Sequence, residues 1–390
     1  MNRAVNAALL LPDGFQSHVA NIGIKDGSAD FVVVVADRPC AAAGLFTTSS
    51  FAGPSVLVSR RNVADHAARA VVVISKNANV ATGTVGLADA EEVVIGVAER
   101  LGIATDDVLI ASTGVIGRRY PMERVRAGIA AMPAVLTGTD AAAVASGIMT
   151  TDTVMKTAEA HCGNARIVGV AKGVGMIEPN MATLITLFFT DADVDAEVLD
   201  TVFRRVIDRT FNCVSVDTDT STSDTAIILA SGAAGAVQSS EFEAALHDVA
   251  LSLTKQIASD GEGAQTLIEV CVDGAASATQ ARTVAKAIVN SPLVKTAVHG
   301  ADPNWGRVAM AIGKCTTADE VDQARVVIRF GALEVYPTLV GDDGLAALAE
   351  YMRGEEVRIH VSLGAGDQES TAWGCDLTDG YVRINADYTT

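Results

Sequence analysis

Apolar runs and helical periodicities alternate along almost the whole chain. Continuous apolar residues at 31–36 and 70–74 predict strands that are buried on both faces. Apolar side chains at helical spacing predict helices at 88–101 and 196–210. Strands alternating with helices predict an α/β fold, an α+β sandwich built in layers.

The same patterns predict the remaining elements. Further strands are expected at 107–111, 166–170, 183–190, 213–216, 226–230, 267–272, 326–330 and 357–361. Further helices are expected at 122–131, 141–149, 240–259, 281–289 and 345–351, and Ser240-Glu-Phe-Glu243 resembles a capping box. The change to strands around one helix near the end predicts a smaller C-terminal α+β domain, at about 285–390.

Polar residues follow several of these predicted elements, which is a common place for site residues. The polar positions are Thr113-Gly114, Thr150 to Thr153, Lys172, Thr183, Asp260 to Gly263 and the tail from Asn385 to Thr390. One stretch stands out, because a lysine-glycine loop from Lys172 leads through Pro179-Asn180 to Ala182 and then Thr183, which opens an apolar run.

This stretch has two interpretations. A chain that cut itself before Thr183 would expose a threonine α-amine, whose pKa near ~8 lets it act as base for its own hydroxyl. The alternative is a β-hairpin whose turn contains Gly, Pro and Asn, with Thr183 as an ordinary strand residue. Spacing alone leaves both open.

Composition narrows the classes of partner. The 390 residues are 49% hydrophobic but only 4% aromatic, and the formal net charge is -18. Nucleic-acid binding requires a basic surface, so this charge argues against it, whereas local acidic clusters suit a cationic small molecule.

No apolar run approaches the ~20 residues that span a bilayer, so no membrane partner is expected. Six scattered cysteines without a Cys-x-x-Cys pair are typical of reduced thiols, which predicts a cytoplasmic protein.

Three short motifs match known sites only superficially. Gly306 to Lys314 resembles a phosphate-binding loop, but six residues separate its glycines where four are needed. Ser252-Leu-Thr-Lys255 lies in an amphipathic helix without the companion motifs of its class. Asp217-Thr-Asp219 starts like a calcium loop but lacks the required glycine and glutamate. We therefore expect neither a metal nor a cofactor.

Several longer motifs, in order over essentially the whole chain, resemble the ornithine acetyltransferases, the self-processing glutamate N-acetyltransferases of the arginine pathway. The motifs are Thr150-Thr-Asp-Thr153, Lys172-Gly-Val-Gly-Met176, Pro179, Met181-Ala-Thr183, Ser259-Asp-Gly-Glu-Gly263, Asn290-Ser-Pro-Leu-Val-Lys295 and Asp302-Pro-Asn-Trp-Gly-Arg307. The chain looks most similar to the paralogues found in clavulanic-acid-type gene clusters.

The resemblance implies an N-terminal-nucleophile-like αββα enzyme that cleaves itself between Ala182 and Thr183. Residues 1–182 would form an α chain and residues 183–390 a β chain, in protomers that assemble into α2β2 or larger oligomers. The enzyme would move acetyl from N2-acetylornithine to glutamate in ping-pong fashion.

The resemblance also implies the site residues. Thr183 would be the nucleophile, and the Thr113 hydroxyl with the Gly114 amide would form the oxyanion hole. The substrate-contacting positions would be Thr150, Lys172, Thr183, Glu262, Asn385 and Thr390. The tail that carries the last two would then have to fold back into the site.

Three alternatives stay open. A self-processing amidase or aminopeptidase of related fold would pass the acyl group to water. A specialised-metabolism enzyme would acetylate a different amine, and a scaffold protein would keep only the fold. Whether acetyl-CoA is also a donor is equally open.

Overall fold

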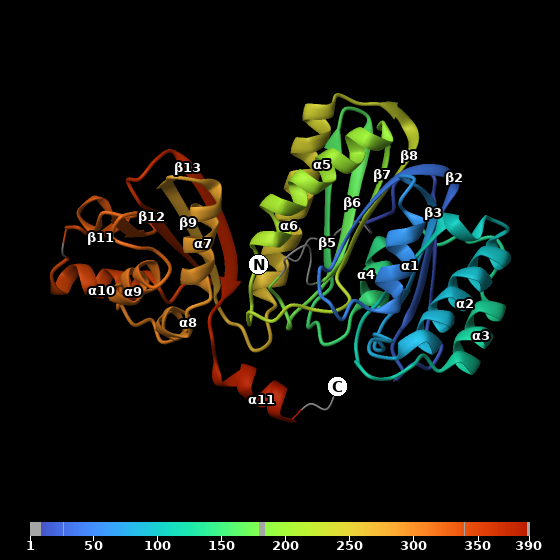
Figure 1. Cartoon of the computed structure of the whole chain (residues 1–390), viewed down its shortest axis with the longest axis horizontal. Coiled ribbons are helices and arrows are strands. Elements are labelled where there is room, and N and C mark those ends of the chain that lie inside the picture. The colour runs from blue at the N-terminus through green and yellow to red at the C-terminus, as the bar shows by residue number, and fades with distance from the viewer. Residues whose placement is uncertain (1–8, 26, 179–183, 339, 388–390) are drawn as a thin grey trace, which may run out of the picture.

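A computed structural model describes residues 9–25, 27–178, 184–338 and 340–387 of the chain. The described residues form a larger lobe around an eight-stranded sheet and a smaller lobe around a five-stranded sheet (Figure 1). The larger lobe contains the elements β1 (Phe15–Ala20), β2 (Phe31–Phe46), α1 (Pro54–Asn62), β3 (Ala67–Ile74), α2 (Gly83–Leu101), β4 (Val108–Ser112), α3 (Met122–Ala131), α4 (Ala141–Ile148), β5 (Lys156–Cys162), β6 (Ala165–Lys172), β7 (Ile185–Asp193), α5 (Ala196–Arg209), β8 (Thr225–Ala236) and α6 (Ser239–Ser259).

The larger sheet has the order β4-β3-β2-β8-β7-β6-β5, with β1 paired to β2. Its long strand β2 changes partners along its length. The part from Phe31 to Val35 pairs with β1 and β3, whereas the part from Ala41 to Phe46 pairs with β8. Because the register shifts between Val35 and Cys40, β2 joins two layers of strands that face each other across a shared hydrophobic core.

Alternating side chains in the strands produce three cores in this lobe. In β7, Leu187 faces the core between the two strand layers, and Phe188 packs against α5 and α6. In β3, Val71 belongs to the inner core and Val72 to the core under α2 and α3. The lobe is therefore a four-layered αββα sandwich, with α5 and α6 outside one layer and α2 and α3 outside the other (Figure 1). The layered α/β prediction is confirmed.

Helix α5 illustrates why these segments form helices and pack where they do. Its buried residues Leu199, Val202, Phe203, Val206 and Ile207 recur every three or four positions and make one apolar face. Each side chain buried in this way contributes about 1.5–3 kcal/mol relative to exposure. The carboxylate of the preceding aspartate caps the first turn.

The smaller lobe has the strand order β11-β10-β12-β9-β13 and its own hydrophobic core. Its elements are β9 (Leu267–Ala275), α7 (Ala278–Val289), α8 (Pro292–His299), α9 (Gly306–Gly313), β10 (Val327–Phe330), β11 (Leu333–Tyr336), α10 (Asp342–Tyr351), β12 (Glu356–Ser362) and β13 (Gln368–Cys375), and α11 (Asp379–Asp387) follows. The expected domain start near residue 285 lies within α7, whereas the sheet of this lobe already includes β9.

Two local predictions are wrong. No strand forms at 213–216, because Ser215 donates its backbone N–H to Trp373 and Val216 donates to Ile177, two separate segments that cannot form one ladder. The capping box at Ser240 is also absent. Helix α6 begins one residue earlier, after Gln238, so Ser240 lies within its first turn.

Two properties of the described residues concern the chain as a whole. All six cysteines are free thiols. Among the helices of the described ranges, none combines the length and apolar character needed to cross a bilayer.

Candidate active site

A cavity of about 320 Å³ lies where several element ends of the larger lobe meet. Six predicted site residues line it, namely Thr113, Gly114, Thr150, Lys172, Glu262 and Asn385. Ala182, Thr183 and Thr390 lie outside the described residues. Leu184, the residue that follows Thr183 in the sequence, also lines the cavity. Positions more than 270 residues apart in the sequence are thus brought to one cavity.

Thr113 and Gly114 lie directly after β4, and the Thr113 N–H donates to the carbonyl of Ile74 at the end of β3 (3.1 Å). Gly114 has φ +125°, and a Cβ there would lie 2.2 Å from the carbonyl carbon of Lys76. Only glycine fits such a close approach. Within the described part of the chain, the Gly114 amide donates no hydrogen bond, and the residue is exposed to the cavity.

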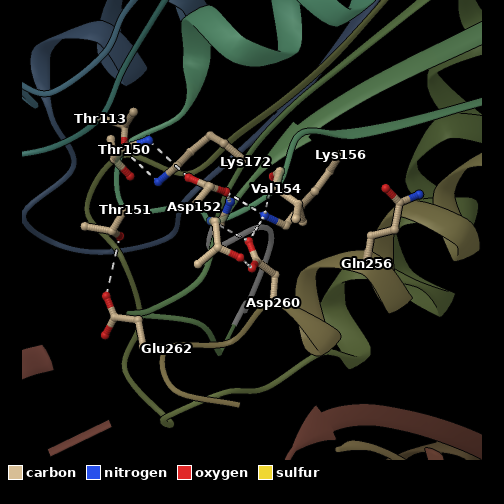
Figure 2. Close-up of polar contacts among 12 residues, drawn as sticks. Thr113, Thr150, Thr151, Asp152, Val154, Lys156, Lys172, Gln256, Asp260 and Glu262 are labelled. Atoms are coloured by element: carbon tan, nitrogen blue, oxygen red, sulfur yellow. Dashed lines mark hydrogen bonds and ion pairs between the residues drawn. The ribbon is translucent and has the colours of Figure 1, made fainter. Parts of the chain in front are cut away.

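Lys172 ends β6 and is buried. Its Nζ donates to the Thr113 hydroxyl at 3.2 Å, so an ammonium and a hydroxyl lie together on the cavity lining (Figure 2), and Gly114 follows Thr113 there. Burial lowers the pKa of Lys172, while the carboxylate of Asp152 opposes this effect.

A network beneath Lys172 holds the wall in place. Lys156 Nζ lies 2.8 Å from Asp152 Oδ1 and 2.5 Å from Asp260 Oδ2, and the Lys156 and Asp152 side chains are fully buried. Asp152 also accepts from the backbone N–H of Gly173 at 2.7 Å and of Thr150 at 3.1 Å (Figure 2). Burial raises the pKa of Asp152, but the charges of Lys172 and Lys156 outweigh this and lower it.

The sequence analysis missed this network as a functional unit. Asp152 and Asp260 stand inside motifs that were noted for their threonines and for Glu262, and Lys156 opens a strand, β5, that was not predicted. A lysine at the start of a strand, four residues after an aspartate, was the available signal.

Glu262 lies in the turn after α6, where its N–H donates to the Val174 carbonyl at 2.9 Å. Its carboxylate accepts from Asn385 Nδ2 at 2.8 Å and from the Thr151 hydroxyl at 3.5 Å. The neighbouring Gly263 has φ +73°, and a Cβ there would meet the backbone of Tyr381 at 2.5 Å. The turn therefore carries both the carboxylate and the contact surface for α11, which brings Asn385 to the cavity.

The chain is anchored on both sides of the predicted cleavage position. Before it, Glu178 donates its N–H to Asp219, and its carboxylate accepts from Asn290 at the end of α7. After it, the Leu184 carbonyl accepts from the N–H of Thr225 at 2.9 Å, and β7 then pairs with both β6 and β8. The predicted strands at 166–170 and 183–190 therefore pair antiparallel, which is compatible with either interpretation of the segment that joins them.

The geometry suits chemistry at a carbonyl group. The Gly114 amide, the Thr113 hydroxyl and the Lys172 ammonium are donors that can stabilise a developing oxyanion. Glu262 supplies an anionic acceptor for a substrate ammonium on another side of the cavity.

Comparisons with known proteins point in one direction. Residues 16–390 match the model of the ArgJ family. The chain is 57% identical to arginine biosynthesis bifunctional protein ArgJ 2 of Nostoc, covering 97% of this chain and 98% of that protein. It is 56% identical to glutamate N-acetyltransferase Oat2 of Streptomyces clavuligerus, over 97% of this chain and 98% of that one. A crystal structure of arginine biosynthesis bifunctional protein argJ from Bacillus halodurans is 42% identical and covers 51% of this chain and 96% of that chain, with a TM-score of 0.48.

Proposed function

The chain belongs to the ArgJ family and is an acyltransferase of arginine biosynthesis, and we propose that it moves acetyl from N2-acetylornithine to glutamate. The acetyl group travels on Thr183 as an ester, so the two half-reactions share one site. The observation that carries the proposal is the cavity itself, which unites Thr113, Gly114, Lys172 and Glu262 next to Leu184.

Self-cleavage of the Ala182–Thr183 bond prepares this nucleophile. The cut yields chains 1–182 and 183–390 and frees the α-amine of Thr183, which then serves as the base for the adjacent hydroxyl. The hydrogen bonds of Glu178 and Leu184 support this step, because they fix the chain on both sides of the scissile segment. Strands β6 to β8 hold the two chains together after the cut, as one α/β heterodimer.

The donors on one wall stabilise both tetrahedral intermediates. The Gly114 N–H and the Thr113 hydroxyl bind the oxyanion, and Lys172 adds positive charge from 3.2 Å behind the Thr113 hydroxyl. A single such donor contributes about 2.7–4 kcal/mol to the transition state.

The opposite side of the cavity binds the amino acid parts of the substrates. Glu262 receives a substrate ammonium, and Asn385 keeps the Glu262 carboxylate oriented through its 2.8 Å hydrogen bond. Thr150 also lines the cavity, nearer to Thr113 and Lys172, and adds a hydroxyl (Figure 2). Thr390 belongs to the same tail as Asn385, and we assign it a substrate contact by family resemblance.

Replacing the nucleophile tests this function. Thr183→Ala should remain a single chain of about 40.2 kDa in intact mass and lose transferase activity, whereas Thr183→Ser keeps a hydroxyl and should be cut. Thr186→Ala is the matched control. It removes a hydroxyl three residues after Thr183, within β7, that donates to a backbone carbonyl, and this variant should be processed normally.

Donor and acceptor assays separate transfer from hydrolysis. Wild-type enzyme with N-acetylornithine should form N-acetylglutamate only when glutamate is present. Transferase activity retained by Thr183→Ala would exclude the ester intermediate, and steady release of free acetate without glutamate would indicate a hydrolase.

A further inference from the structure

The segment immediately before β8 forms another wall of the cavity. Ser221, Thr222, Ser223 and Asp224 all line it, and none of them was assigned a role above. Among the described residues, the side-chain oxygens of Thr222, Ser223 and Asp224 are buried without a hydrogen-bond partner. Buried polar groups are almost always paired, so a run of three unpaired ones facing a cavity indicates that a bound molecule completes them.

Asp224 is the most unusual of the three. The residue is only 1% exposed, and neither carboxyl oxygen meets a hydrogen-bond partner at normal geometry in the described ranges, although the Ser221 hydroxyl lies near the group. Its backbone, by contrast, is fixed, because its carbonyl accepts from the Thr47 N–H at 3.0 Å. The next residue, Thr225, donates to Leu184 and pairs with Ile185 at the start of β7.

This register sets Asp224 close to the reacting position. Leu184 follows Thr183 directly in the sequence, and the hydrogen bond from Thr225 ties Leu184 to the residue after Asp224. Asp224, Leu184, Thr113 and Gly114 line the same cavity. The carboxyl group is therefore available at the site where the amines would react.

The charges around Asp224 favour a proton on it. Burial raises its pKa well above the ordinary value, and the nearby Ser221 hydroxyl and the charge of Lys172 only partly oppose this. The other charged side chains on the cavity lining are Lys25, Lys76 and Glu262. A carboxyl group whose pKa is raised in this way is better suited to donate a proton than an ordinary carboxylate.

We propose that Asp224 is a further catalytic residue, the acid and base that carries one proton from the incoming ammonium to the leaving amine. The proposal rests on the acetyl transfer proposed above, and it assigns to this side chain the proton transfer that the Thr183 amine does not carry out in each half-reaction.

The protons balance in the first half-reaction. The Thr183 oxygen attacks the acetyl carbon and loses its proton to its own amine. The acetyl C–N bond breaks as the leaving nitrogen takes the proton of Asp224. The free amine then receives a second proton from the Thr183 ammonium and departs as an ammonium ion, which leaves Asp224 as a carboxylate.

The second half-reaction restores the enzyme. The incoming ammonium gives one proton to the Asp224 carboxylate and becomes a nucleophilic amine. It attacks the acetyl ester and loses another proton to the Thr183 amine, which passes it to the departing Thr183 oxygen. One amide and one ammonium enter, one amide and one ammonium leave, and Asp224 is again protonated.

The pH dependence of the first half-reaction tests this role. For the wild type, kcat/KM for the acetyl donor should fall at alkaline pH, because Asp224 must hold its proton. Asp224→Asn should lower this parameter by about 10²–10⁴-fold and lose the alkaline fall, as expected for removal of an acid–base group. Asp191→Asn is the matched control, because Asp191 is a buried carboxylate of β7 that binds the backbone of Arg166 far along the strand.

A second variant keeps the test decisive if Asp224→Asn is not processed. Asp224→Glu retains a carboxyl group in a different position, so it should shift the alkaline fall and keep more activity than Asp224→Asn. An alkaline fall that is unchanged in Asp224→Glu, or in cleaved Asp224→Asn, would overturn the assignment. If the wild type itself transfers no acetyl group, the proposed function fails, and the two failures are thus distinguishable.

Discussion

Two buried aspartates interact electrostatically with Lys172, and their surroundings differ sharply. Asp152 accepts from Lys156 at 2.8 Å and from the backbone of Gly173 at 2.7 Å, and its pKa is lowered. The Asp224 carboxyl group has only the nearby Ser221 hydroxyl to oppose its desolvation by hydrogen bonding, and burial raises its pKa. The same residue type at similar burial thus has its ionised form favoured in one case and its protonated form favoured in the other.

The difference follows from the number of partners that each carboxyl group has. Asp152 is fully paired, so ionisation is favoured and the side chain joins the ends of α4, β5 and β6. Asp224 lines the cavity, so its carboxyl oxygens can form hydrogen bonds with a bound substrate. Partner count therefore distinguishes a carboxylate that stabilises the site from one that is available for chemistry.

The largest effect, on the free energy of unfolding, is expected from replacing the paired aspartate, Asp152. Asp152→Asn removes one of two carboxylates from buried Lys156 and should lower the free energy of unfolding by about 3–5 kcal/mol. Asp224→Asn breaks no hydrogen bond in the described structure and should be neutral or stabilising. Urea denaturation of both variants measures the contrast, and equal destabilisation would contradict it.

The pH dependence of stability tests whether the charge of Asp152 is the cause of this effect. The pKa of folded Asp152 lies below its ordinary value of about 3.9, so its stabilisation is complete above that value and is lost as the pH falls through the lowered one. The stability gap between wild type and Asp152→Asn should therefore be widest near neutral pH and narrow below about pH 4. A gap independent of pH would show that charge is not its cause.

The next largest effect is expected from Gly114→Ala, at another residue that lines the same cavity as Asp224. The added methyl group would meet the backbone of Lys76 at 2.2 Å and displace the Gly114 amide, so kcat should fall by about 10²–10³-fold. Gly117→Ala is the control, because Gly117 also has positive φ, +83°, but an added Cβ meets nothing within 4 Å. Similar kcat losses in both variants would point to loop strain.

The smallest effect is expected at the tail. Asn385→Ala leaves Glu262 without its 2.8 Å hydrogen bond, and because Asn385 is exposed the KM for the amino acid substrate should rise only about fivefold. Val382→Ala, another exposed position of α11, should leave KM unchanged. Steady-state kinetics with glutamate varied distinguishes them.

Local patterns of apolar residues were enough to predict many of the strands and helices. Apolar runs predicted β3 and β8, and helical spacing predicted α3 with its observed bounds, because such elements bury one continuous or periodic apolar surface. The 213–216 strand failed because its backbone hydrogen bonds go to two different segments, a property that no local pattern contains.

The residues of the candidate site also form two groups, those that the sequence indicated and those that only the folded structure reveals. Lys172 and Glu262 could be named from the sequence because they stand in long motifs, and Thr113 because it follows a predicted strand and the family resemblance implies an oxyanion hole there. No sequence motif singled out Asp224, and its buried position depends on its backbone bond to Thr47 after β2 and on the bond of Thr225 to Leu184 before β7.

Periodicity and motif order along the chain were enough to predict the layered α/β class and the family, and they suggested which residues could react. Tertiary structure alone decided which carboxylates are paired, how closely Gly114 approaches Lys76 and where Asn385 comes to lie. The physical reason is that desolvation and hydrogen bonding set the state of an ionisable group, and both depend on neighbours distant in sequence.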